Sequence, residues 1–467
     1  MSWRGIAAFY FNFYDILKLL PGEDPSRTVF EQALCGPLDF VLVNSGLDRS
    51  FSGSVFDFAK LYALALKQIS SSDARSRSEG LLTDLLRRHF NSKITSDVTS
   101  AVAPLIGVNG SFVTVHHALN AFNNNFFVKP ATDHVLADQS IWHQGMGSQC
   151  TTFNAPISIS LFEPWERFLR QAGVQFRMSS LVVQLSNADG EVATAQDKVT
   201  QVRLDSGSQY DCDAVVVAVD PWTAARLVNT NYDAGEKNIQ VAGQLVFAER
   251  IDLPRKAKVR GYVLGESAYN ITFVPDEVLF RDRDLGEYTK GIPAKTVWSF
   301  TCCESDTPGP ATGKTLREVS ESELQLEVIA QFRAELGQEM GRAIPVVQFW
   351  SEWRFPASGV DKFVNRSSNQ DQPKAGRLST MPINAVLTGA YCHTSTDIFS
   401  MEAATEAGID AARALDSEID APKRQWKPLG PLRAIDTVLF RLGLPHVFWS
   451  ILIIVLVRVC AKMSQLF

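Results

Sequence analysis

The residues best suited to chemistry lie at the start of one C-terminal helix. Residues 385–388 form a short apolar run that ends at Gly389, and helical spacing resumes after a polar loop. Ser400 is placed to cap this helix, and a ligand or a neighbouring backbone could approach its first turns closely. The side chains there are small: Ala403, Ala404 and Gly408.

A helix N-terminus of this kind favours negative charge, because its first N–H groups lack helical partners and the helix dipole is positive at that end. The pattern therefore indicates a ligand group that carries or develops negative charge. An ordinary strand–loop–helix, in which alanine is used for its helix propensity, fits the same residues.

The other reactive side chains match no known catalytic or metal-binding motif. His116, His117 and His393 qualify as acid–base groups by residue type alone, and surface or core-bonded histidines explain them better. No cluster of His, Cys and carboxylate has metal-ligand spacing, so we expect no metal site. The G-x-S-x-G turn of serine hydrolases is also missing from the sequence.

The elements around this helix mix helices and strands. Helical periodicity runs through residues 56–127, and residues 162–172 predict another helix. Ser320 and Glu323 form a capping box before a further helix. Strands are expected at 174–177, 181–185, 199–204, 214–219, 244–248, 259–264, 271–274, 297–302 and 346–350. This mixture predicts an α/β protein with a separate sheet domain.

A set of aromatic side chains in the last strands and beyond could line an apolar pocket, but core packing is the preferred interpretation. The set is Trp298, Phe300, Phe349, Trp350, Trp353 and Phe355.

The start of the chain predicts an amphipathic helix over residues 9–20, which Pro21 and Gly22 end. No G-x-G-x-x-G fingerprint for a dinucleotide pyrophosphate occurs in the 467 residues. The nearest match, residues 145–147, lacks the third glycine and a preceding apolar strand, so a loop is expected there.

Composition narrows the class of protein. With 45% hydrophobic and 21% charged residues the chain is globular, and its length suggests two to three domains. A formal net charge of −6 leaves no basic stripe for nucleic acid. Seven cysteines without a CxxC pair indicate reduced thiols in a cytosol-facing or organellar compartment.

The C-terminal end differs from the rest. A basic, proline-rich linker over residues 422–431 precedes an apolar run over 447–457, with Trp449, Arg458 and Lys462 as interface anchors. The run is shorter than the roughly 20 residues that span a bilayer. We expect attachment to a membrane surface or a short tail anchor; a helix buried against another subunit is the alternative.

Residues 387–412 resemble the C-terminal flavin motif of the amine oxidase and phytoene desaturase superfamily. In that family the strand ends in Gly-Asp, and a Glu-Gly-Ala helix start points at the pyrimidine edge of the flavin. Two positions depart from this pattern: Ala390 stands where the family has Asp, and Ala403 where it usually has Gly. The first departure removes a carboxylate that helps hold FAD.

Residues 162–219 resemble the segment of the same family in which a Pro-Trp helix precedes a strand near the adenine ring, and Val182 matches the residue whose backbone meets that ring. The resemblance implies FAD as cofactor and assigns no catalytic residue. The cofactor-binding residues that it implies are Val182, Gly389, Ala390, Glu402, Ala403, Ala404 and Gly408.

The implied fold is the α/β, two-domain FAD/NAD(P)-binding fold of flavin amine oxidases, without its N-terminal βαβ unit. We expect 1–55 to hold an amphipathic helix and a remnant of the FAD domain, and 56–150 the helical part of the substrate domain. FAD-domain segments would follow at 151–235 and 356–420, on either side of the sheet part at 236–355, and 421–467 would be the linker and membrane-associating tail.

The expected function is a membrane-associated FAD-dependent oxidoreductase that removes hydride from an apolar isoprenoid or polyene, or from an amine. The alternative is a cofactor-free pseudoenzyme that serves a membrane complex as a structural or assembly subunit. A third interpretation is that processing removed the N-terminal unit or that another chain supplies it.

Overall fold

The computed structural model describes residues 5–7, 9–44, 47–48, 53–106, 109–118, 120, 150–228, 239–253, 259–280, 283–289, 291, 293–341, 345, 372–423 and 430–447. This part of the chain combines helices with parallel and antiparallel strands, so the α/β prediction is confirmed. The predicted loop at 145–147 and the predicted strand at 346–350 lie outside the described residues.

The largest sheet has eight strands in the order β1-β4-β2-β10-β11-β12-β9, with β3 paired to β2. All pairs are antiparallel except β2 with β10. The strands are β1 (Ile6–Ala7), β2 (Leu34–Asn44), β3 (Leu47–Asp48), β4 (Cys150–Phe153), β9 (Val241–Phe247), β10 (Val259–Leu264), β11 (Ile271–Pro275) and β12 (Thr296–Cys302).

Helix α13 (Glu321–Met340) packs on this sheet, and its predicted capping box between Ser320 and Glu323 is confirmed. The core between them is aromatic: the Trp298 ring lies 5.0 Å from Phe273 and 5.4 Å from Phe332. Trp298 and Phe300 are buried, which confirms the core interpretation for these two residues. The aromatic residues of 349–355 lie outside the described residues.

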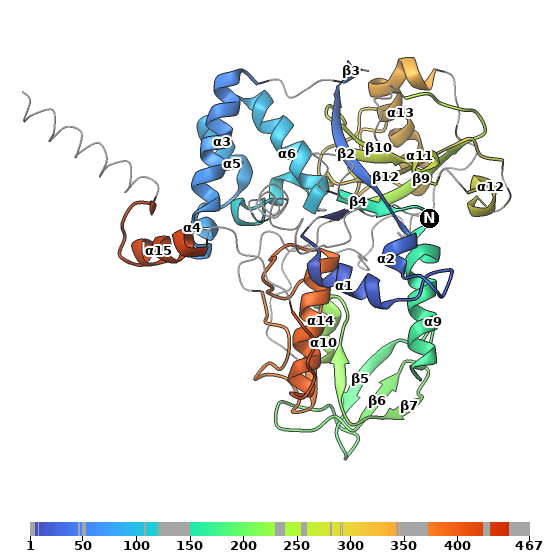
Figure 1. Ribbon diagram of the computed structural model, residues 1–467, viewed down its shortest axis with the longest axis vertical. Helices are drawn as coiled ribbons and strands as arrows, with labels where there is room; N and C mark the ends of the chain where they lie inside the picture. Colours follow the sequence, from blue (N-terminus) through green and yellow to red (C-terminus); the bar gives the residue numbers. More distant parts are fainter. Residues whose placement is uncertain are drawn as a thin grey trace, which may run out of the picture.

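Two smaller sheets lie at the opposite end of the molecule, in the lower half of Figure 1. Strand β13 (Ala385–Leu387) pairs parallel with β8 (Val215–Val217), and β5 (Val182–Ser186), β6 (Gln201–Leu204) and β7 (Gln209–Asp211) form an antiparallel meander. Helices α9 (Glu163–Gln171), α10 (Pro221–Leu227) and α14 (Met401–Leu415) flank them.

The strand predicted at residues 174–177 is wrong. Those residues have no strand assignment, and Val174, Gln175 and Arg177 are all exposed. Because neither face of the segment is buried, its β-branched and aromatic residues gain nothing from sheet packing.

The first helix, α1 (Phe11–Leu19), confirms the predicted amphipathic helix and packs against α2 (Val29–Gln32) and α14. The helical prediction for 56–127 is confirmed over its described part, although Phe56 is exposed. The helices there are α3 (Val55–Ile69), α4 (Asp73–Ser78), α5 (Leu82–His89) and α6 (Ser92–Ile106). Short helices α11 (Asp276–Leu279) and α12 (Leu285–Tyr288) border the large sheet.

The last described helix, α15 (Gly430–Arg441), lies against α4, beside the group of helices α3 to α6 (Figure 1). Within the described ranges, no helix has the length and hydropathy that a membrane crossing requires. Among the described cysteines, Cys302, Cys303 and Cys392 are buried free thiols and Cys212 is a half-buried one; the reduced compartment stays a prediction. The division of the chain into six segments stays a prediction.

Candidate functional site

The predicted site is built on the unit formed by β13, a loop and α14. All three residues of β13 are buried, and the strand lies in register with Val215–Val217 of β8. At the end of the strand Gly389 adopts a φ of +149°, and a Cβ at that position would lie 2.5 Å from the ring of Tyr391. Glycine is therefore required for the chain to leave the sheet there.

Helix α14 begins as the sequence predicts, since the Ser400 hydroxyl oxygen accepts a hydrogen bond from the Ala403 N–H at 3.1 Å. Ala403 is fully buried, whereas Ala404 is exposed. A Cβ at Gly408 would meet no atom of the described residues within 4 Å. The first turn of α14 thus offers one exposed, small side chain at Ala404, Gly408 is half-buried farther along the helix, and Ala403 belongs to the packed interior.

Glu402 joins α14 to α1. Its buried carboxylate accepts hydrogen bonds from the Asn12 N–H at 3.0 Å, the Asn12 amide group at 2.7 Å and the Phe13 N–H at 2.9 Å. Burial raises the pKa of Glu402 to about 8, although these three donors favour the ionised form. The Glu402 carboxyl group therefore caps the N-terminus of the neighbouring helix α1, because it accepts hydrogen bonds from two N–H groups of its first turn.

Farther along α14, Glu406 and Asp410 hold the segments on its flank. Glu406 accepts hydrogen bonds from the Ser395 N–H at 3.0 Å and the Ser395 hydroxyl at 2.7 Å. Lys423 lies 2.6 Å from an Asp410 carboxylate oxygen and 3.7 Å from Glu406. These contacts fasten the loop before α14 and the segment after it to the same helix face.

Asp397, in that loop, is the centre of a buried polar cluster. It adopts a φ of +47°, which is uncommon for a non-glycine residue. Its carboxylate accepts a hydrogen bond from His116 Nε2 at 2.5 Å and forms an ion pair with Arg77. His393 Nδ1 lies 3.5 Å from the other carboxylate oxygen. Burial opposes ionisation, but the hydrogen bonds and the histidines hold the pKa of Asp397 well below its usual range.

The opposite nitrogen of His116 lies 2.7 Å from the Ser76 hydroxyl. Ser76 is buried and also donates to the Asp73 carbonyl at 3.0 Å, so this Ser–His–Asp series is a structural network with no access for a substrate. His116 and His117 are core-bonded and His393 is exposed, which confirms the sequence interpretation.

Sequence reasoning missed Asp397, because its partners His116 and Arg77 lie 281 and 320 residues away. Beside the cluster is a polar cavity of about 260 Å³ between the loop, α14, α4 and α15. Its walls include Asn120, Lys374, His393, Asp397, Asp410 and Arg433. The residues that the structure describes contain no group of acidic, histidine or cysteine side chains able to hold a metal ion.

The structure brings most of the predicted cofactor residues together. Gly389, Ala390 and residues 402–408 belong to one strand–loop–helix unit, and Ala390 is half-buried. Val182 lies on β5, and its side chain packs against the apolar cluster that contains Leu387 and Ala407. Val182 thus borders the same unit from the neighbouring sheet.

The part of the fold that would bind the diphosphate of a dinucleotide differs from the usual arrangement. Strand β1 pairs antiparallel with β4 in the large sheet, so β1 and α1 do not form the parallel unit that binds a dinucleotide pyrophosphate. On β8, which does lie in a parallel pair, Val216 is 49% exposed. Parallel strands are ordinarily covered on both faces.

A parallel strand that ends at a glycine turn and feeds a capped helix, beside a mixed sheet, is an α/β arrangement. Residues 21–416 match the model of the flavin containing amine oxidoreductase family. Since this match covers most of the 467 residues, the chain belongs to that family.

Solved structures share the fold. Cyclohexylamine oxidase from Brevibacterium oxydans IH-35A is 11% identical with a TM-score of 0.53, and the match covers 90% of this chain and 88% of that one. A putrescine oxidase mutant from a structure-based redesign of cofactor binding is 10% identical with a TM-score of 0.56, at coverages of 90% and 88%. A search of curated proteins finds no match.

The family implies FAD, and the residues present fit one end of that cofactor. Ala404 is small and exposed in the first turn of α14, a Cβ at Gly408 would meet no described atom within 4 Å, and the dipole at this helix N-terminus suits the flavin ring. The other end lacks two family features, because the sequence has no G-x-G-x-x-G turn and Ala390 carries no carboxylate. A diphosphate would need other N–H donors than those of a glycine-rich turn.

Proposed function

We propose that this protein is a membrane-attached, FAD-dependent oxidoreductase that removes hydride from an apolar isoprenoid or polyene, or from an amine. The observation that carries the proposal is the capped N-terminus of α14, which packs beside β13 and carries the small, exposed Ala404, with Gly408 farther along the helix. Bound flavin would supply the hydride acceptor. The family membership supports the flavin part of this proposal.

The chain's own residues would hold and polarise the flavin. Gly389 sets the turn out of β13, Ala390 follows it, and Val182 borders the unit from β5. The α14 N-terminus would stabilise negative charge on the ring. Glu402 fixes the first turn of α14 against α1 through its three hydrogen bonds, and Ala403 fills the space behind it.

An apolar substrate is favoured by the C-terminal sequence. Residues 448–457 are uncharged and largely apolar, and Arg458 and Lys462 follow. A tail of this kind suits attachment to a membrane, where an isoprenoid or polyene would be drawn from the bilayer. Putrescine oxidase and cyclohexylamine oxidase, whose names refer to amines, keep an amine substrate in the proposal.

The second candidate is a cofactor-free pseudoenzyme that serves a partner protein as a structural or assembly subunit. Two observations favour it: the missing G-x-G-x-x-G turn and Ala390 in place of the family's aspartate. Together they remove a pyrophosphate cradle and a carboxylate that helps hold FAD.

A visible absorption spectrum of the purified full-length chain in detergent, followed by mass spectrometry of what denaturation releases, separates the two candidates. The flavin proposal expects a flavin spectrum and released FAD. A colourless protein that releases nothing would favour the pseudoenzyme.

The variant Gly408→Trp tests the position of the site. Its indole should fill the space beside α14 and lower the flavin content about tenfold or more, because the side chain would overlap the bound ring. Gly337→Trp on α13 is the matched control, since a Cβ on that helical glycine also meets no described atom within 4 Å. Equal flavin content in the two folded variants would contradict the assignment.

A further inference from the structure

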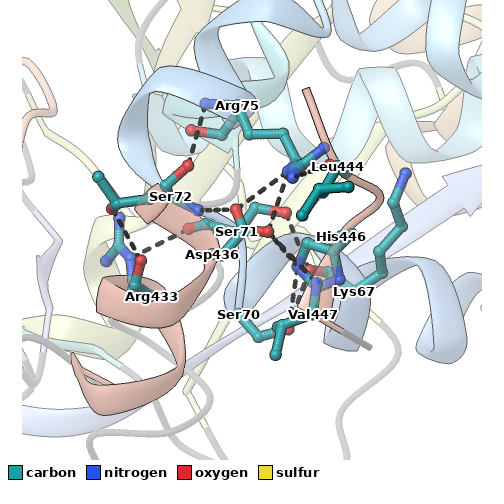
Figure 2. A network of polar contacts seen from close by, with 12 residues as sticks. Lys67, Ser70, Ser71, Ser72, Arg75, Arg433, Asp436, Leu444, His446 and Val447 are labelled. Carbon is teal, nitrogen blue, oxygen red and sulfur yellow. Dashed lines mark hydrogen bonds and ion pairs between the residues drawn. The ribbon is translucent and has the colours of Figure 1, made fainter. Parts of the chain in front are cut away.

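Helix α15 is attached to the protein through its polar face. Asp436, in the middle of the helix, is completely buried, and its carboxylate accepts hydrogen bonds from the Ser72 N–H at 2.7 Å and from Arg75 Nε at 3.0 Å. Figure 2 shows this carboxylate at the centre of a network that joins α15 to the start of α4. A buried ion pair with several donors holds a helix in one rotational setting, because its geometry is directional.

Further contacts fix both ends of the helix. Arg433 pairs with Asp73 and donates to the Ser71 carbonyl at 3.2 Å. At the other end Arg75 Nη2 donates to the Leu444 carbonyl at 2.9 Å, and the buried His446 lies 3.4 Å from the Ser70 hydroxyl (Figure 2). The orientation of α15 is therefore set along its whole length.

The opposite face of α15 is apolar and exposed. Ile435, Val438 and Leu442 follow helical spacing and are 49%, 57% and 66% exposed. Arg441 is the one charged side chain among the exposed residues of 430–447, all of which the structure describes. The remaining exposed positions include Pro431, Ala434 and Leu444.

This arrangement is the reverse of a surface helix in water, which buries its apolar stripe and exposes its polar one. Contiguous exposed apolar surface marks a contact with a protein or a membrane. The residues on either side in the sequence decide between these partners. The segment 423–433 contains Lys423, Arg424, Lys427 and Arg433 and no acidic residue, and 20 residues follow Val447, of which 448–457 are uncharged.

We propose that α15 lies in the plane of a membrane surface, with Ile435, Val438 and Leu442 in the boundary between headgroups and acyl chains. In the basic segment before it, Lys423 and Arg433 are paired with Asp410 and Asp73, so Arg424 and Lys427 are the charges in the sequence that would attract anionic headgroups. The uncharged run 448–457 would add apolar residues to the attachment. Asp436 and Arg75 then set the orientation of the whole protein on the membrane. This inference rests on the membrane attachment in the proposed function and is independent of its flavin.

The test is a lipid titration of the full chain with vesicles of phosphatidylcholine and phosphatidylserine, measured by co-sedimentation. The double variant Val438→Glu, Leu442→Glu should lower the partition coefficient about tenfold or more, because two apolar side chains become charged at the interface. The control is Leu326→Glu, Met178→Glu, which changes two side chains of similar exposure on other elements and should partition as the wild type does.

Circular dichroism and the thermal unfolding midpoint establish that each variant is folded. An unchanged partition coefficient in the folded α15 variant would overturn the proposal, because the apolar run alone would then carry the binding. The proposal would also be overturned if the wild type sediments as a dimer, and the α15 variant sediments as a monomer but binds vesicles as the wild type does. A wild type that leaves vesicles unbound would overturn the membrane attachment as well, whereas the flavin spectrum would report separately on the cofactor.

Discussion

Asp397 and Asp276 are both buried carboxyl groups, yet their surroundings shift their pKa values in opposite directions. Asp397 is ion-paired with Arg77, and burial opposes its ionisation, but its hydrogen bonds with His116 and His393 hold its pKa well below its usual range. Asp276 receives neutral donors only, the Gln244 amide at 3.0 Å and the Ser299 hydroxyl at 2.6 Å, and burial raises its pKa to about 8. The partners around each buried carboxyl therefore decide whether its pKa lies below or above the usual range.

The Asp397→Asn variant should lower the free energy of unfolding by about 3 kcal/mol at pH 7, because the charge that faces Arg77 is lost inside the protein. Asparagine tolerates the positive φ, so backbone strain stays the same. The difference should shrink as the pH falls below the ordinary aspartate pKa, since a group with a lowered pKa loses its stabilising effect in acid.

Urea unfolding of both proteins at several pH values measures this difference. Asp84→Asn is the control, because Asp84 forms an exposed pair with Arg87 at 3.9 Å and its loss should leave stability unchanged. Equal stability of the Asp397 variant and the wild type would show that the pair contributes nothing.

Asp276→Asn should flatten the pH dependence of stability in the neutral range. The folded pKa is raised from 3.8 to about 8, so the stabilising effect is complete below the unfolded value and is lost as the pH rises to about 8. One such group contributes a slope of about 1.4 kcal/mol per pH unit. Asparagine stays neutral and adds no slope.

The measurement is the free energy of unfolding between pH about 5 and about 8, the window in which a single raised carboxyl titrates. Glu402, whose pKa is also raised to about 8, keeps titrating in the variant, so some slope should remain. Identical slopes in the variant and the wild type would refute the account.

At the scale of elements, the turn from β13 into the loop depends on one glycine. Gly389→Ala should lower the free energy of unfolding by more than about 2 kcal/mol, because the added Cβ meets the Tyr391 ring at 2.5 Å and φ is +149°. Gly190→Ala, at φ +80° with no described atom near the added Cβ, carries the backbone cost alone, about 1 kcal/mol. Thermal unfolding measures the loss of stability in both variants. Equal losses would show that the contact of the added Cβ with the Tyr391 ring has no effect.

The elements that the sequence predicted are those with local signals. The α1 stripe, the Ser320–Glu323 capping box and the Ser400 cap each lie within a few residues of the helix that they specify. The strand at 174–177 failed because its residues read as a strand locally but find no sheet that buries them. The orientation of α15 could not be read from sequence either, since Arg75 lies 361 residues before Asp436.

The same reasoning separates the two parts of the candidate site. The α14 N-terminus and Gly389 follow from consecutive residues, so they could be predicted together with the family. The engagement of Glu402 with Asn12 and the cluster around Asp397 arise only when segments distant in the chain meet. Residue type and spacing carry no signal for such contacts.

At the scale of the whole molecule, α15 depends on the helical group for its position. Asp436→Asn should loosen α15 while α3 to α6 stay folded, because it removes the charge that pairs with Arg75. Hydrogen exchange followed by mass spectrometry should show the α15 amides exchanging about tenfold faster, as expected for a local opening that has become easier. Asp416→Asn, at an exposed position after α14, should leave α15 protected. Unchanged exchange in the Asp436 variant would contradict this coupling.

The pairs Asn12–Glu402, Arg77–Asp397 and Arg75–Asp436 each join an early segment of the chain to a late one. Proteins are synthesised from the N-terminus, so both arginines leave the ribosome more than 300 residues before the aspartates that neutralise them. Helix α4 therefore lacks its contact with Asp397 until residue 397 has been synthesised. Its contact with Asp436 can form only after residue 436 has been synthesised. A chain cut off in the middle of synthesis would lack all three connections.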